Sequence, residues 1–256
     1  MMRSDPSLLL QLRTALTLLL VAAALAACTP TLRPGPLADE VRPSPNFGSR
    51  RVSLVVIHHT SNGNAAPALR TLTNPLSEVS AHYLITRTGR IVQLVDERDR
   101  AWHAGRSRWG AISDVNSASI GIELDNDGQE PYGPPLMAAL YRLLEDLRAR
   151  HQLTALAFVG HADVAPGRKV DPSPLFPWRE LAQRGFGLWC DQPYPEPPAG
   201  FDVALGLQAI GYDLSALDAA AWSFGLHYGG RLGGVADLDP AHVACIAGAA
   251  RAAPAL

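Results

Sequence analysis

Five stretches of the chain have the hydrophobic pattern of β-strands. Residues 119–125 alternate between apolar and small or polar side chains, which is the two-residue period of a strand with two different faces. One face would carry Ile120, Ile122 and Leu124, and the other Ser119, Gly121 and Glu123. Residues 51–57 and 155–160 are continuous apolar runs, typical of strands buried on both faces. Residues 80–86 and 90–95 flank Thr88-Gly89 and predict a hairpin.

Helical patterns follow at several places along the chain. Apolar residues between Pro134 and His151 recur on one stripe, with charged residues outside it. A short helix is expected over 176–184, closed by Gly185. We therefore predict an α/β domain over residues 51–189, with a mixed central sheet flanked by helices. A proline-rich linker over 190–200 precedes a small C-terminal helical appendage, 201–256, with weak helical stretches at 203–210, 214–226 and 240–253.

The N-terminal segment has the pattern of an export signal. The apolar run 14–27 follows basic residues and is too short to span a bilayer. It ends in Leu25-Ala26-Ala27-Cys28, which resembles the lipobox of bacterial lipoproteins. The resemblance implies a signal peptide over 1–27, a lipidated Cys28, and attachment to the outer membrane facing the periplasm of a Gram-negative bacterium. An ordinary signal peptide with a coincidental cysteine is the alternative. The proline-rich stretch 28–50 would then be a tether.

Charge and cysteine content narrow the function classes. The net charge of −2 gives no indication of nucleic-acid binding. Cys190 and Cys245 remain after processing, and their spacing leaves open both a disulfide and two free thiols. Among 22 basic residues the only lysine is Lys169, in a segment that also contains His161 and Asp171. A compact ammonium between potential metal ligands favours a metal-assisted reaction.

Three candidate ligands come from well-separated segments. His58 ends the first buried strand, His161 ends a later one, and Asp171 lies in the following loop. Two imidazoles and one carboxylate are typical of a catalytic zinc site that keeps a fourth position open. The pattern does not decide between His58 and His59, because adjacent strand residues point to opposite faces.

The chain resembles a known enzyme family in a series of ordered motifs. These are VVIHHTS, AHYLIT, AWHAGRS, SIGIELDN, GHADVAPGRKVDP and LFPWREL, over roughly residues 50–190. They resemble the type 2 N-acetylmuramoyl-L-alanine amidases, which share the fold of peptidoglycan-recognition proteins, and in layout the lipoprotein amidases of the outer membrane.

The resemblance implies a set of roles. Zn²⁺ would be held by His58, His161 and Asp171. Glu123 would take a proton from the attacking water and pass it to the departing amine, and Lys169 would stabilise the oxyanion. The expected reaction is hydrolysis of the amide between N-acetylmuramic acid, or its anhydro form, and L-alanine. We expect Trp102, His103 and Ala104 along the cleft as substrate contacts, with loop packing as the alternative.

Two other functions remain as alternatives. One is a recognition protein of the same fold that binds peptidoglycan without cleaving it. The other is a cytosolic recycling amidase, which conflicts with the export signal. The C-terminal stretch weakly resembles a small peptidoglycan-binding module, although Phe224-Gly225 departs from the usual Phe-Gln pair. It would bind the wall or only pack against the catalytic domain. Expected partners are muropeptides and, through the lipid anchor, the membrane, with no nucleic acid and a monomeric chain.

Overall fold

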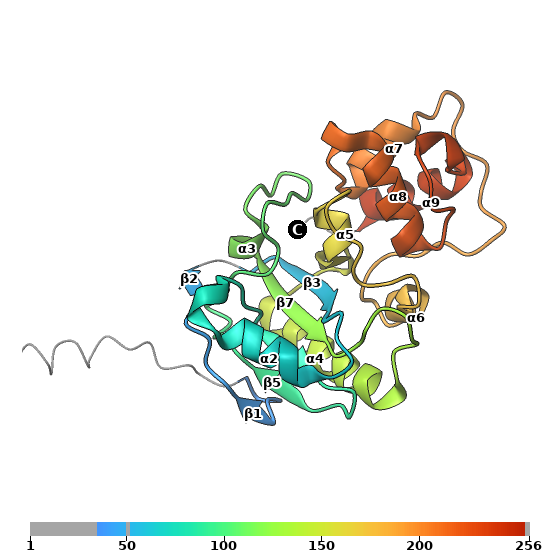
Figure 1. The fold of residues 1–256 in the computed structure, drawn as a ribbon. Coiled ribbons are helices and arrows are strands. Elements are labelled where there is room, and N and C mark those ends of the chain that lie inside the picture. The colour runs from blue at the N-terminus through green and yellow to red at the C-terminus, as the bar shows by residue number, and fades with distance from the viewer. Residues whose placement is uncertain (1–34, 50–51, 254–256) are drawn as a thin grey trace, which may run out of the picture. The chain divides into compact units, whose positions relative to one another are not determined.

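The computed structural model describes residues 35–49 and 52–253, and these contain a mixed six-stranded sheet with the order β1-β5-β4-β7-β3-β8 (Figure 1). Its strands are β1 (Glu40–Val41), β3 (Leu54–His59), β4 (Tyr83–Ile85), β5 (Ile91–Gln93), β7 (Ser119–Leu124) and β8 (Phe158–Gly160). Strand β3 lies parallel to both β7 and β8, β4 is parallel to β7, and β4 and β5 form the expected antiparallel hairpin. The predicted mixed sheet is confirmed.

Two short strands precede residue 51, where the sequence pattern predicts that the domain begins. Strand β1 pairs with β5, and β2 (Phe47–Ser49) pairs antiparallel with β6 (Asp99–Ala101) in a second, two-stranded sheet. Both β1 and β2 fall inside the stretch 28–50 expected to be a tether. Strands of two or three residues are too short to show a period, and the prolines near them favoured the interpretation as a tether. The start of the domain at residue 51 was therefore placed too late.

Helices and short 3-10 turns make up the other regular elements among the described residues. They are α2 (Ala65–Thr73), α3 (Val115–Ala118), α4 (Pro134–His151), α5 (His161–Val164), α6 (Trp178–Gln183), α7 (Val203–Ile210), α8 (Leu217–Tyr228) and α9 (Pro240–Ala252). Single 3-10 turns lie at Pro75–Ser77, Ala155–Ala157, Leu214–Ala216 and Val235–Asp237. The predicted helices at 134–151 and 203–210 are confirmed at both ends. The sequence analysis missed α2, because only Ala68 and Leu72 of its nine residues are buried.

The alternating side chains of the central strands build cores on both faces of the sheet. Val55 and Ile57 of β3 pack with α4, together with the apolar face of β7. Leu54 and Val56, on the opposite face of β3, pack with the C-terminal helices. At the other end of the sheet this second face is covered by α2. The face that carries His58 and Glu123 is therefore bordered by α2 and by the C-terminal helices.

The C-terminal appendage shares a core with the sheet. Phe224 of α8 and Ile246 of α9 belong to the same apolar cluster as Leu54. A disulfide joins Cys190 to Cys245 in α9, which settles the pairing that the sequence left open. The appendage is therefore an integral layer of the fold. Within residues 35–49 and 52–253, no helix combines the length and apolar character needed to cross a bilayer.

Candidate metal centre

The carboxyl ends of three parallel strands bring the candidate residues to one edge of the sheet. Strand β3 ends with His58 and His59, and β8 ends at Gly160, so that His161 is the first residue of α5. Glu123 of β7 pairs directly with His58 across the sheet. Ligand sites in open α/β sheets form at such edges, because the strands stop there and loops leave space.

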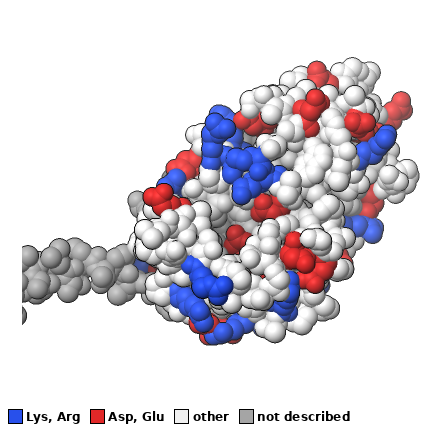
Figure 2. All heavy atoms as spheres, viewed as in Figure 1, with Lys and Arg blue, Asp and Glu red and all other residues white. Residues whose placement is uncertain are grey.

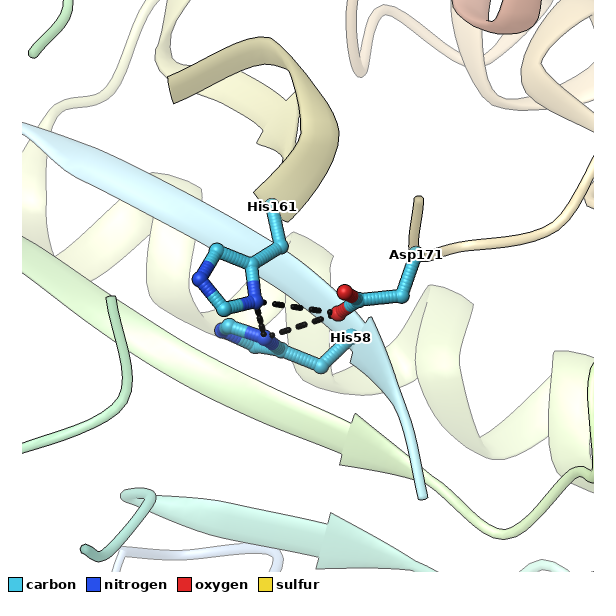
Figure 3. A group of neighbouring side chains, drawn as sticks. All are labelled: His58, His161 and Asp171. Carbon is cyan, nitrogen blue, oxygen red and sulfur yellow. Dashed lines mark hydrogen bonds and ion pairs between the residues drawn. The ribbon is translucent and has the colours of Figure 1, made fainter. Parts of the chain in front are cut away.

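His58, His161 and Asp171 converge on one point, as Figure 3 shows. The Nδ1 atoms of the two imidazoles are 3.0 Å apart, and each lies 3.1 Å from Oδ2 of Asp171. A tetrahedral ion with bonds of about 2.0–2.1 Å keeps its ligand atoms about 3.3 Å apart. The three atoms thus fit three vertices of a tetrahedral site.

The protonation of these histidines suits metal binding. Both rings are buried, with 2% of His58 and 4% of His161 exposed. Burial and, to a smaller extent, the neighbouring His161 lower the pKa of His58 to about 4. His58 is therefore neutral at pH 7, the form in which a ring nitrogen offers a lone pair to a cation. Nε2 of His161 lies 3.3 Å from the carbonyl oxygen of Ala104 and donates to it, so that in the neutral ring the lone pair is on Nδ1.

His59 faces away from the three converging atoms. Its Nδ1 accepts a hydrogen bond from the backbone N–H of Ser173 at 3.2 Å and lies 3.1 Å from the hydroxyl of Tyr132. The structure thus brings the first histidine of the pair into the cluster and uses the second to hold the loop just beyond Asp171. This resolves the choice that the alternating strand pattern left open.

A pocket of about 290 Å³ opens over the cluster. Besides the three converging residues, its lining includes Glu123, Lys169, Trp102 and His103. Figure 2 shows a hollow in this face of the molecule, with acidic atoms in it and basic side chains both above and below it. The residues expected to act on a substrate therefore share one solvent-accessible space with the candidate ligands.

Glu123 has the environment of a group that exchanges protons. Its Oε2 is buried and has no hydrogen-bond partner among the described residues. Burial, together with the carboxylate of Asp171, raises the pKa of Glu123 to about 8, against the opposing effect of the Lys169 ammonium. A carboxyl group with a pKa near neutrality can both accept and release a proton at physiological pH.

The segment 102–104 differs from its expected role along the cleft. Ala104 is fully buried among apolar side chains, so its methyl group cannot meet a ligand in the pocket, which corrects that part of the prediction. Trp102 is partly buried and lines the pocket as expected. His103 lines the pocket too, but its ring also contacts His58, with Nδ1 of His103 3.0 Å from Nε2 of His58.

The predicted lipidation site, Cys28, lies outside the described residues.

Asp163 is a site residue that the sequence analysis missed. It is the third residue of α5, and its carboxylate accepts from the backbone N–H of Gly160 at 2.6 Å. The same carboxylate is 2.6 Å from the hydroxyl of Tyr212 and 2.6 Å from Nδ1 of His227, both in the C-terminal region. An acid at the third position of a helix is a capping signal readable from sequence, but its distant partners are not.

The fold and the site together define a class. A mixed α/β sheet carries an open centre of two imidazoles and one carboxylate at its edge, with a buried glutamate beside it. This is the arrangement of hydrolytic metalloenzymes.

Comparison with known sequences identifies the family. Residues 48–174 match the family described as N-acetylmuramoyl-L-alanine amidase. The amidase AmpD of Haemophilus influenzae, described as acting on 1,6-anhydro-N-acetylmuramyl-L-alanine, is 34% identical over 157 residues, and the match covers 85% of its length. The chain belongs to the N-acetylmuramoyl-L-alanine amidase family, so the resemblance stated from the motifs is confirmed.

Other relatives extend the match. AmiD of Escherichia coli is 42% identical over 157 residues, which cover 55% of this chain and 56% of AmiD. The chain therefore spans little more than half the length of this curated relative. A structure of E. coli AmiD with anhydro-N-acetylmuramic acid-L-Ala-D-γ-Glu-L-Lys superposes with a TM-score of 0.65 at 34% identity, covering 79% of this chain and 89% of that one. AmpDh3 of Pseudomonas aeruginosa in complex with an anhydromuramic pentapeptide gives a TM-score of 0.63 at 31% identity, with 78% and 91% covered.

Proposed function

We propose that the protein is a zinc-dependent amidase that hydrolyses the bond between the lactyl carbonyl of N-acetylmuramic acid, or its anhydro form, and the nitrogen of L-alanine. The observation that carries the proposal is the triangle of ligand atoms, 3.0–3.1 Å apart, in the same pocket as the buried carboxylate of Glu123. Family membership and relatives solved with anhydromuramyl peptides support the choice of substrate.

Zinc is the metal that suits this donor set best. Two neutral imidazoles and one carboxylate at tetrahedral spacing are typical ligands of catalytic Zn²⁺, whereas Mg²⁺ and Ca²⁺ prefer oxygen ligands in larger numbers. When bound, the cation supplies Lewis acidity that polarises the amide carbonyl and favours ionisation of water.

Glu123 is the proposed proton carrier. Its carboxylate takes a proton from the water that attacks the lactyl carbonyl carbon. As the carbon–nitrogen bond breaks, the same group delivers that proton to the nitrogen of L-alanine. Burial and the neighbouring Asp171 hold the pKa of Glu123 near the range where both transfers are feasible at neutral pH.

Lys169 is the proposed stabiliser of the oxyanion. It is partly buried and lines the pocket with Glu123, and its charge lowers the pKa of that glutamate. An ammonium held in a partly water-excluded pocket stabilises negative charge that develops on the carbonyl oxygen.

Metal removal and a single substitution test the proposal together. Dialysis against a chelator should abolish cleavage of a muropeptide, and added Zn²⁺ should restore it. Glu123→Gln should bind Zn²⁺ normally but lose at least about 100-fold in kcat, within the usual contribution of general acid–base catalysis. Full activity in excess chelator would exclude a metal mechanism, and full activity of Glu123→Gln would exclude this proton carrier.

The same proposal includes attachment to the outer membrane through a lipidated Cys28. It is supported by the apolar run that ends in Leu25-Ala26-Ala27-Cys28. Several acyl chains on one residue give stable anchoring, at about 0.8 kcal/mol per buried CH₂. Cys28→Ala should move the protein from the membrane fraction to the soluble fraction with unchanged specific activity. An unprocessed chain in the cytosol would instead support the recycling alternative.

A further inference from the structure

His103 and Ala104 lie against the two candidate ligand histidines, and the side chain of Asn116 holds their backbone in place. The buried Asn116, in α3, accepts from the backbone N–H of His103 at 3.1 Å and from that of Ala104 at 2.8 Å. The two residues fixed in this way present one acceptor each to the metal centre. Ala104 offers its carbonyl oxygen to His161, and His103 offers Nδ1 to His58.

The donors and acceptors in the series Ser119–His103–His58 follow from Ser119, the residue farthest from the metal centre. The hydroxyl of Ser119 donates to the carbonyl of Val115 at 2.5 Å, because a carbonyl oxygen can only accept. With its proton used there, the Ser119 oxygen accepts from Nε2 of His103, 3.1 Å away. A neutral His103 then has an unprotonated Nδ1, which can only accept from Nε2–H of His58.

This order fixes the tautomer of both ligands. With its hydrogen on Nε2, neutral His58 turns a lone pair on Nδ1 towards Asp171. His161 has the same tautomer, because its Nε2 faces the carbonyl of Ala104. Two lone pairs and a carboxylate oxygen would otherwise face one another without a hydrogen between them, so a cation at their centre satisfies all three.

Gly121 of β7 lies against the imidazole ring of His103 and leaves the space that the ring occupies. A methyl group added at Gly121 of β7 would lie 2.4 Å from Cγ of His103 and 2.6 Å from its Cδ2, which is impossible without displacement. Gly121 and Ser119 share the face that the sequence analysis assigned to small and polar residues, and the imidazole of His103 occupies the space they leave.

We propose that His103 and Ala104 form the outer layer of the metal centre, and that His103 is a positioning residue for His58 rather than a substrate contact. The inference rests on the proposed metal function. What it adds is a role for one hydrogen bond, from Nε2–H of His58 to Nδ1 of His103. Ser119 fixes the direction of this bond by accepting from Nε2 of His103. The bond holds the His58 ring in the tautomer and orientation that bind the ion.

Zinc affinity of the full chain, measured by competition with a chromogenic chelator, provides the first test. His103→Leu should weaken Zn²⁺ binding about 10- to 100-fold, as loss of an outer partner of a ligand does. His103→Asn should recover most of the affinity, because its side-chain oxygen can take the place of Nδ1 as acceptor. Gly121→Ala should also weaken binding, although every hydrogen-bonding group remains. His151→Leu is the matched control, since His151 is also partly buried but contacts Glu97, and it should bind like the wild type.

A spectroscopic readout separates this inference from the proposed function. In zinc-free wild-type protein, ¹⁵N imidazole shifts should place the hydrogen of His58 on Nε2, and in His103→Leu a measurable fraction should move to Nδ1. If folded His103→Leu binds Zn²⁺ within twofold of the wild type and keeps the His58 tautomer, the inference is overturned while the proposed function stands. Wild-type protein that bound no Zn²⁺ would overturn the proposed function instead, and the shifts would still decide the tautomer.

Discussion

The hydroxyl of Tyr212 donates to the carboxylate of Asp163 over 2.6 Å, and both residues are buried. Asp163 lies in α5, the short helix that begins with the proposed ligand His161, whereas Tyr212 follows α7 in the C-terminal region. The same carboxylate also contacts the ring of His227 at 2.6 Å. The C-terminal region therefore contacts the helix that carries one of the three proposed metal ligands.

Removing the Tyr212 hydroxyl should weaken this connection. Tyr212→Phe leaves a buried carboxylate with one hydrogen bond fewer, and we expect it to lower the free energy of unfolding by about 1–3 kcal/mol. The control is Tyr141→Phe, whose hydroxyl bonds Glu180 at the surface and should change stability by less than about 0.5 kcal/mol. Urea denaturation of the three proteins measures the difference, and equal midpoints would contradict a stabilising role for this contact.

The disulfide between Cys190 and Cys245 should also stabilise the layered arrangement. It closes a loop across a sequence separation of 55 residues, which restricts the unfolded chain. The double variant Cys190→Ala, Cys245→Ala should lose about 2–4 kcal/mol of unfolding free energy. Comparison with wild type under oxidising and reducing conditions measures the effect. A reductant that destabilised both proteins equally would show that the disulfide contributes nothing.

Replacing Lys169 tests whether a compact ammonium is required. Lys169→Ala should reduce kcat about 10²- to 10³-fold without changing zinc affinity, which is the usual effect of losing one oxyanion-stabilising group. Lys169→Arg should recover only part of the rate, because a broad guanidinium places its charge differently. The control Arg179→Lys alters an exposed pair with Asp191 and should leave the rate unchanged. Full activity of Lys169→Arg would contradict the claim that the reaction requires a compact ammonium at position 169.

The buried Glu97 should make stability depend on acid pH. Burial alone would raise the pKa of Glu97, but hydrogen bonds from Arg150, His151 and Tyr83 hold it well below its ordinary value of 4.5. A carboxylate with a lowered pKa in the folded state stabilises the protein above its unfolded pKa, and this contribution is lost as the pH falls towards the folded pKa.

The unfolding free energy of the wild type should therefore fall steeply below about pH 4.5. Glu97→Gln should cost about 2 kcal/mol at pH 7, because Arg150 loses its charge-assisted hydrogen bonds to the carboxylate, and the stability of the variant should fall less steeply in acid. Glu145→Gln, on the exposed side of α4, should follow the wild type. Parallel acid slopes for the wild type and Glu97→Gln would show that other groups govern acid unfolding.

Sequence patterns predicted those parts of the fold that depend on local periodicity. The alternation in 119–125 correctly placed Ile122 on the core-facing side and Glu123 on the opposite side. The apolar stripe of 134–151 predicted both ends of α4. Strands β1, β2 and β6 are too short for a period and depend on pairing with distant segments. Local signals could not have predicted them.

The site divides in the same way. The convergence of His58, His161 and Asp171 followed from strand ends and family motifs, and the structure places their ligand atoms together. The contacts of His103 with His58 and of Asp163 with Tyr212 join segments 45 and 49 residues apart, so no local pattern contains them. The outer partners of the ligands therefore became visible only once the chain was folded.

The most direct test of the central claim is mass spectrometry of a purified anhydromuramyl tetrapeptide before and after incubation with the zinc-loaded protein, alongside Asp171→Ala. The proposed activity predicts two products, the free anhydro-sugar acid and a peptide with L-alanine at its new amino terminus, their masses summing to that of the substrate plus one water. Asp171→Ala should leave the substrate intact. An uncut substrate with the wild type loaded with zinc, or cleavage at a bond within the peptide, would contradict the proposal.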